Sequence, residues 1–116
     1  MEISGKVWGN TQLIFRNNNF EIHRIEVNKG GFCSKHKHNH KSNGFFMESG
    51  ELEIQVWKMD YNLCDKTLLK PKQFSIVKPG EFHMFLALTD VIAYEIYWVD
   101  LDPSDIVREI CGGVKE

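Results

Sequence analysis

The sequence has few cysteines and no long apolar run. The three cysteines, Cys33, Cys64 and Cys111, are an odd number at wide and unrelated spacings, so they suggest neither a CxxC pair nor a disulfide framework. No apolar stretch approaches the roughly 20 residues that a membrane-spanning helix needs. The first five residues also lack the basic and apolar regions of a signal peptide. These absences predict a cytoplasmic protein with reduced thiols and no membrane partner.

The sequence also has few arginines and a small net charge. Only three of the 14 basic residues are arginines, and the net charge is −2 with neutral histidines. This balance argues against nucleic acid as a partner, and it leaves few candidates for arginine clamps on phosphate groups. The length of 116 residues, with 42% hydrophobic and 26% charged residues, is typical of one soluble globular unit. We therefore expect a single domain over residues 1–116.

A sustained helical period is missing from most of the chain. Short alternating or apolar runs separated by Gly, Pro and Asn turns are present instead, and such a pattern is typical of an all-β sandwich or barrel. We expect strands at 11–15, 20–27, 45–50, 51–57, 66–69, 74–77, 83–88 and 91–99, after a lead-in at 5–9 that is not a strong strand. One or two helical turns are expected only at 102–110, before the Gly112-Gly113 stop.

The most distinctive stretch is residues 30–50. His36, His38 and His40 alternate, and alternation on an extended backbone places side chains on one face of a strand. That face would include Phe32 and Ser34, and the opposite, solvent-facing side would carry Cys33, Lys35, Lys37 and Asn39. Neutral imidazole is the commonest protein ligand for transition metals. The row of histidines therefore indicates a metal site, although a ligand-free exposed hairpin has the same pattern.

A second stretch supplies one more histidine. Pro79 and Gly80 favour a turn, and His83 follows at the start of an expected strand. The two stretches together resemble the two motifs of the cupin superfamily. In the first motif Gly30, His36, His38, position 43 and Gly50 are all in register.

The sequence departs from the cupin motifs at three positions. Asn43 replaces the glutamate that usually binds the metal. In the second motif Gly80 and His83 fit, but Pro79 is one place late and Ala87 stands where asparagine is usual.

Within this superfamily the chain resembles small cupins related to the C-terminal domain of type II mannose-6-phosphate isomerase. The likeness extends over the opening Lys6-Val-Trp8-Gly9, both motifs, and the tail segment 102–108. The resemblance implies an all-β jelly-roll barrel (a double-stranded β-helix), a divalent metal, and a homodimer formed through the N-terminal strands. The family's closing Asp-Asp-x-Gly-Arg is absent here.

The resemblance implies His36, His38 and His83 as metal ligands. Asn43 offers an uncharged amide oxygen, and His40 is a second candidate for a fourth ligand, although the register places it nearer the rim. His23 lies outside both motifs and is interpreted as an ordinary strand residue. A neutral ligand set suits Zn, Fe, Mn or Ni, and the sequence does not select among them.

For acid–base chemistry, Glu95 is the candidate, because it interrupts an apolar strand. The preferred function is metal-assisted chemistry on, or binding of, a small polar molecule such as a sugar or sugar phosphate, in the manner of an isomerase. Two alternatives stay open: an Fe(II) three-histidine oxygenase, and a non-catalytic module that binds or senses a small molecule.

Overall fold

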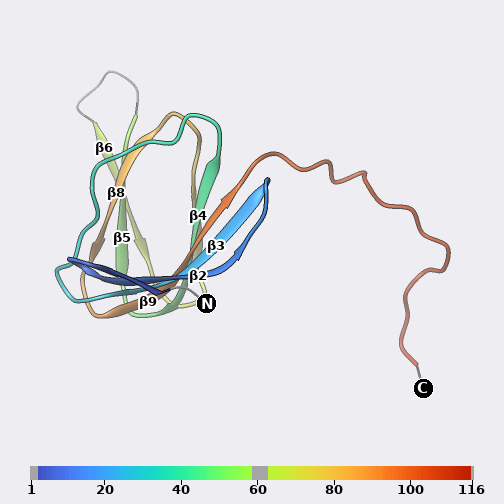
Figure 1. Cartoon of the computed structure of the whole chain (residues 1–116), viewed down its shortest axis with the longest axis horizontal. Coiled ribbons are helices and arrows are strands. Elements are labelled where there is room, and N and C mark those ends of the chain that lie inside the picture. Colours follow the sequence, from blue (N-terminus) through green and yellow to red (C-terminus); the bar gives the residue numbers. More distant parts are fainter. Residues whose placement is uncertain (1–2, 59–62, 116) are drawn as a thin grey trace.

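The computed structural model describes residues 3–58 and 63–115, which form nine β-strands (Figure 1). The strands are β1 (Ile3–Lys6), β2 (Gly9–Arg16), β3 (Phe20–Val27), β4 (Ser42–Ser49), β5 (Leu52–Trp57), β6 (Cys64–Leu69), β7 (Phe74–Val77), β8 (Phe82–Ala87) and β9 (Val91–Trp98). In these two ranges no helix is long and apolar enough to cross a membrane.

The strands form two antiparallel sheets. The larger has the order β1-β2-β3-β9-β4-β7, and the smaller has the order β6-β5-β8. Because β9 lies between β3 and β4, strands far apart in sequence become neighbours, as in a jelly roll. This placement brings side chains of β3, β4 and β9 to one wall of the barrel, opposite β8.

The core lies between the two sheets and follows the alternation of the strands. In β5, Leu52 and Ile54 are buried and Val56 packs against the core. Alternate residues of an antiparallel strand point to opposite faces, so each strand supplies one apolar row. The buried apolar side chains are Ile25, Val27, Phe45, Met47, Leu52, Ile54, Leu69, Val77, Phe85, Ala87, Val91 and Ala93.

The two ends of the chain were predicted unequally well. The lead-in at 5–9, which was not expected to be a strong strand, contains the turn between β1 and β2, and these strands pair through Lys6 and Gly9. The helical turns expected at 102–110 are absent, and residues 99–115 run away from the sheets with exposed side chains (Figure 1). A helix of under ten residues is marginal unless packing supports it, and these residues have no apolar face against the barrel.

The histidine stretch is also not the regular strand that the alternation predicts. Residues 31–41 contain only two isolated bridges, Phe32 with Leu86 and His36 with His83. The two bridges are four residue steps apart in this segment, from 32 to 36, but only three steps apart in β8, from 86 to 83. This one-residue slip changes which side chains face inward between Phe32 and His36.

Candidate metal centre and its pocket

His36 and His83 are held together by their own backbones. The amide of each donates to the carbonyl oxygen of the other, with N–O distances of 3.1 Å from His36 and 2.8 Å from His83. The Gly80 amide donates to the carbonyl of His38 at 2.7 Å, which fixes the end of the same loop. The relative positions of the three histidines are therefore set by backbone hydrogen bonds between the two sequence motifs.

The three imidazoles converge on one point. The ring centroids lie 5.0 Å apart for His36 and His38, 4.4 Å for His36 and His83, and 5.5 Å for His38 and His83. One ligand nitrogen from each ring lies within 4.8 Å of the other two. This spacing is suitable for three nitrogens around a single ion bound at about 2.1 Å.

Hydrogen bonds orient two of the rings. His36 Nδ1 lies 2.7 Å from the carbonyl oxygen of Ser34, and His83 Nδ1 lies 3.1 Å from that of Glu81. Because a carbonyl can only accept, Nδ1 carries the proton in each ring and Nε2 keeps its lone pair. Backbone carbonyls orient metal-binding histidines in this way in known sites.

The third ring carries an unsatisfied nitrogen. His38 Nε2 is buried and has no hydrogen-bond partner within the described part of the chain. A buried nitrogen without a partner costs free energy, and a metal ion would satisfy it. The donor set therefore fits a transition metal.

Asn43, on β4, completes the group. Its side chain is 1% exposed, and its Oδ1 lies 3.1 Å from His83 Nε2. Since Nε2 of a neutral His83 presents a lone pair, two electron-rich atoms face each other. A cation bound to both would stabilise this arrangement, so Asn43 fits as an uncharged fourth ligand.

The surroundings favour the neutral form of two of these histidines, His38 and His83. Desolvation, with a smaller contribution from the charge of Lys41, lowers the pKa of His38 from 6.5 to about 4. Burial also lowers the pKa of His83. Imidazole must be neutral to bind a metal, so these shifts favour metal binding at neutral pH.

A pocket of about 580 Å³ opens beside His36. Glu21, His23, Lys41, Glu95 and Tyr97 form much of its polar wall, and Val7, Trp8, Phe32 and Phe85 form an apolar wall. The volume is within the usual range for small-molecule sites.

Glu95 lies in this polar wall, on β9. The hydroxyl of Tyr97 donates to Glu95 Oε2 at 2.7 Å, and burial raises the pKa of the Glu95 carboxyl. His23 faces Glu95 across the β3–β9 pair and meets the Tyr97 ring edge-on, at 6.0 Å between centroids. A carboxyl with a raised pKa beside a pocket is suited to proton transfer.

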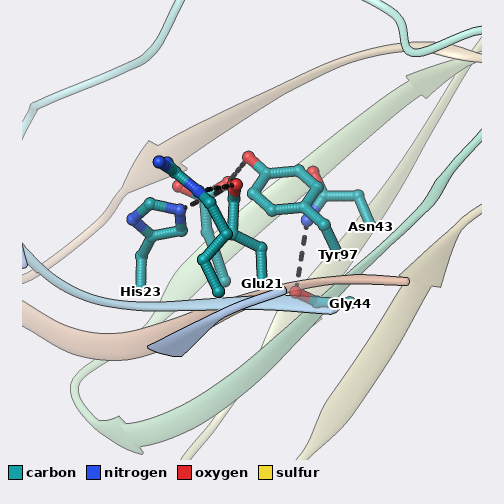
Figure 2. A network of polar contacts seen from close by, with 7 residues as sticks. Glu21, His23, Asn43, Gly44 and Tyr97 are labelled. Carbon is teal, nitrogen blue, oxygen red and sulfur yellow. Dashed lines mark hydrogen bonds and ion pairs between the residues drawn. The ribbon is translucent and has the colours of Figure 1, made fainter. Parts of the chain in front are cut away.

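His23, interpreted from sequence as an ordinary strand residue, is part of the pocket wall. Its Nε2 lies 2.9 Å from Glu21 Oε2, and Glu21 also accepts from Arg16 (Figure 2). Figure 2 shows that Glu21, His23 and Tyr97 point to the same side of their neighbouring strands. The register of β3 against β9 brings these residues together. Alternation within one strand does not reveal which residues of a distant strand lie opposite.

Two further residues of the histidine loop are now placed. His40 is exposed and is not in the three-histidine group, in agreement with its interpretation as a rim residue. Cys33, expected on the solvent side, instead packs against the core and lines the pocket, because of the one-residue slip after Phe32. Burial raises the pKa of Cys33 to about 11, so it is a neutral thiol at neutral pH.

Comparisons with known proteins identify the fold. No protein-family model and no curated protein sequence matches the chain. The chain is similar in structure to KdgF from a Halomonas species, with a TM-score of 0.73 and 12% identity over 87% of this chain and 90% of that one. It is also similar to the cupin domain of Schizosaccharomyces pombe Cnp3, with a TM-score of 0.69 and 16% identity over 86% and 69%.

A third similar structure is the capsular polysaccharide assembling protein CapF from Staphylococcus aureus. The TM-score is 0.75 at 15% identity, over 90% of this chain but only 32% of CapF, so the chain spans about a third of that protein. At these identities the likeness shows the fold alone. The chain has the cupin jelly-roll fold, and the all-β prediction is confirmed.

Proposed function

We propose that this chain is a metal-dependent cupin in which His36, His38, His83 and Asn43 hold one divalent ion. The observation that carries the proposal is the convergence of three imidazoles, two of them oriented by backbone carbonyls. The adjacent pocket would bind a small polar molecule. We also propose that residues 1–116 act as one domain, and that two copies associate through the N-terminal strands.

The activity that fits best is proton transfer next to a carbonyl group, as in an isomerase. A bound divalent ion would supply Lewis acidity that polarises a carbonyl or enediolate oxygen. Glu95 would exchange the proton with the substrate, since burial raises its pKa above that of an ordinary carboxyl and so favours a form that can donate a proton and take it back. Tyr97 would orient the Glu95 carboxyl through its hydroxyl, and the apolar wall around Trp8 and Phe85 would limit access of water.

A second candidate is an Fe(II) oxygenase. The observation in its favour is Asn43, which leaves the histidine site without a carboxylate. Oxygen uptake by the Fe(II)-loaded protein with thiols or diketones would support it. Conversion of hexose phosphates or other hydroxy-ketones with Mn(II) or Zn(II) would support the isomerase. Tight binding of a small molecule without turnover would favour a binding module.

The first test is the metal content of the purified protein, measured by mass spectrometry. We expect close to one equivalent of Zn, Fe, Mn or Ni in the wild type, and a loss of at least tenfold in His38→Ala and in the triple variant His36→Ala, His38→Ala, His83→Ala. His40→Ala is the matched control, because His40 is an exposed histidine two residues from His38.

Circular dichroism would establish that each variant is folded. A folded wild type that takes up none of the four metals on reloading would overturn the proposal. Equal metal loss in His40→Ala and His38→Ala would show that the assignment of the ligands is wrong.

A further inference from the structure

The charges around the pocket favour one class of ligand. This inference rests on the proposed metal site and concerns the molecule that binds beside it. Three neutral imidazoles and one amide leave the charge of a divalent ion uncompensated by its protein ligands. A site of this kind favours an anionic ligand at the remaining positions.

Lys41 adds a positive charge to the same space. Its side chain is half-buried and lines the pocket with His36, and its Nζ lies 4.2 Å from the centre of the Tyr97 ring. Among the described residues no carboxylate forms an ion pair with Lys41, whereas Lys58 is paired with Glu81.

The two carboxyl groups of the pocket do not cancel this charge. Burial raises the pKa of Glu95, which favours its uncharged form. Glu21 is ionised but is occupied on both oxygens, by Arg16 and His23. Although burial opposes it, hydrogen bonds from His23 and Arg16 lower the pKa of Glu21. The remaining basic residue of the pocket, Lys6, is exposed on β1.

We propose that the pocket binds a small organic carboxylate with a neighbouring oxo or hydroxyl oxygen, and that Lys41 holds its charged end beside the metal centre. Two adjacent oxygens can occupy two open positions of one ion, and the ammonium of Lys41 would compensate the carboxylate charge. The rest of the molecule would lie against Trp8 and Phe85.

A carboxylate is favoured over a phosphate ester for a specific reason. Bidentate recognition of phosphate is the usual role of arginine. No arginine is among the described residues that line the pocket, and Arg16, which contacts the lining residue Glu21, is already bound to it. The one half-buried lysine ammonium of the pocket, that of Lys41, is better matched to a singly charged carboxylate than to a doubly charged phosphate ester.

The test uses protein loaded with Co(II), whose visible spectrum reports changes at the metal. Pyruvate and glycolate are the probes, and methyl pyruvate, which has the same oxo group without the charge, is the control ligand. We expect pyruvate and glycolate to change the spectrum saturably and methyl pyruvate to bind at least tenfold more weakly. Lys41→Met should weaken pyruvate binding about tenfold and leave methyl pyruvate unchanged.

Lys37→Met is the matched control variant. Lys37 lies in the same loop but is exposed, with its Nζ 5.0 Å from the centre of the Phe82 ring, and it does not line the pocket. The Lys37→Met variant should bind pyruvate as tightly as the wild type does. Equal affinity of Lys41→Met and wild type for pyruvate, equal binding of pyruvate and methyl pyruvate, or tighter binding of glycerol phosphate than of pyruvate would each overturn the inference.

The number of Co(II) ions bound per chain distinguishes a failure of the carboxylate proposal from a failure of the proposed function. Protein that binds one Co(II) but shows none of the charge-dependent effects would retain the metal site and lose the carboxylate assignment. Folded protein that binds neither Co(II) nor any of Zn, Fe, Mn and Ni would overturn both.

Discussion

Replacement of Asn43 by aspartate tests whether this side chain belongs to the metal centre. The two side chains have nearly the same shape, so Asn43→Asp would place a carboxylate where the amide oxygen now lies 3.1 Å from His83 Nε2. If Asn43 is a ligand, its oxygen becomes charged and the metal should bind more tightly. If it is only a buried polar residue, the new charge should destabilise the fold without a gain in metal affinity.

The size of the effect follows from two opposing contributions. Opposite unit charges 4 Å apart attract by about 4 kcal/mol at an effective dielectric constant of about 20. Desolvation of a buried carboxylate removes a large part of this gain, and the hydrogen bond from Asn43 Nδ2 to the Gly44 carbonyl is lost as well. A net gain of about 1.4–2.8 kcal/mol would correspond to roughly ten- to a hundredfold tighter binding.

The assay is competition for metal against a chelator of known affinity at pH 7.5, with thermal unfolding as a second readout. At equal free metal, a tenfold tighter site should raise the metal-induced increase in Tm by about 3–6 °C for a chain of this length. Asn39→Asp is the charge-matched control, because Asn39 is exposed in the same loop. Unchanged or weaker affinity in a folded Asn43→Asp protein would refute Asn43 as a ligand.

Three further predictions concern stability. Because the pKa of Glu95 is raised, the folded protein keeps a proton that the unfolded chain releases above pH 4.5, so the free energy of unfolding falls as pH rises. Urea unfolding should therefore show that Glu95→Gln stabilises the protein more at pH 8 than at pH 5. An equal stabilisation at the two pH values would contradict the raised pKa. Conversely, the pKa of His38 is lowered from 6.5 to about 4, so the metal-free protein should lose stability as pH falls through this window. His38→Gln should reduce that loss of stability. If His38→Gln lost stability with falling pH as the wild type does, the lowered pKa of His38 would be contradicted. Finally, Gly50→Ala should cost about 2–3 kcal/mol in urea unfolding, because Gly50 has φ +85° and the new Cβ would lie 2.1 Å from the Asp90 carbonyl oxygen. Gly30→Ala, at φ +83° with open space around it, should cost only about 1 kcal/mol, and equal costs would show that the contact with Asp90 does not matter.

The strands were the most predictable part of the fold. Strands β3 and β7 occupy 20–27 and 74–77, as expected, because alternation and turn residues are local properties of the chain. The prediction of helical turns at 102–110 was wrong because it also used only local signals. Acidic residues and a glycine stop describe where a helix could begin and end, but they do not provide the packing that a short helix needs.

The candidate metal centre was only partly accessible to sequence reasoning. Motif spacing selected His36, His38 and His83, and the structure brings these three side chains together. The pocket residue His23 was not assigned, because its place opposite Glu95 depends on the pairing of the distant strands β3 and β9. A one-residue slip in an irregular segment likewise reversed the expected side of Cys33, and no periodicity within that segment indicates it.

Asn43 gives the pocket a consistent electrostatic arrangement. It pairs across the β4–β9 ladder with Tyr97, whose hydroxyl is bound to Glu95. A buried carboxylate at position 43 would therefore stand close to a second carboxyl group, and the repulsion would raise the pKa of Glu95 still further. With an amide there, the proposed metal ligands would all be neutral, Glu95 would remain available to exchange a proton, and the negative charge that a divalent ion requires would come from the ligand that we propose Lys41 holds.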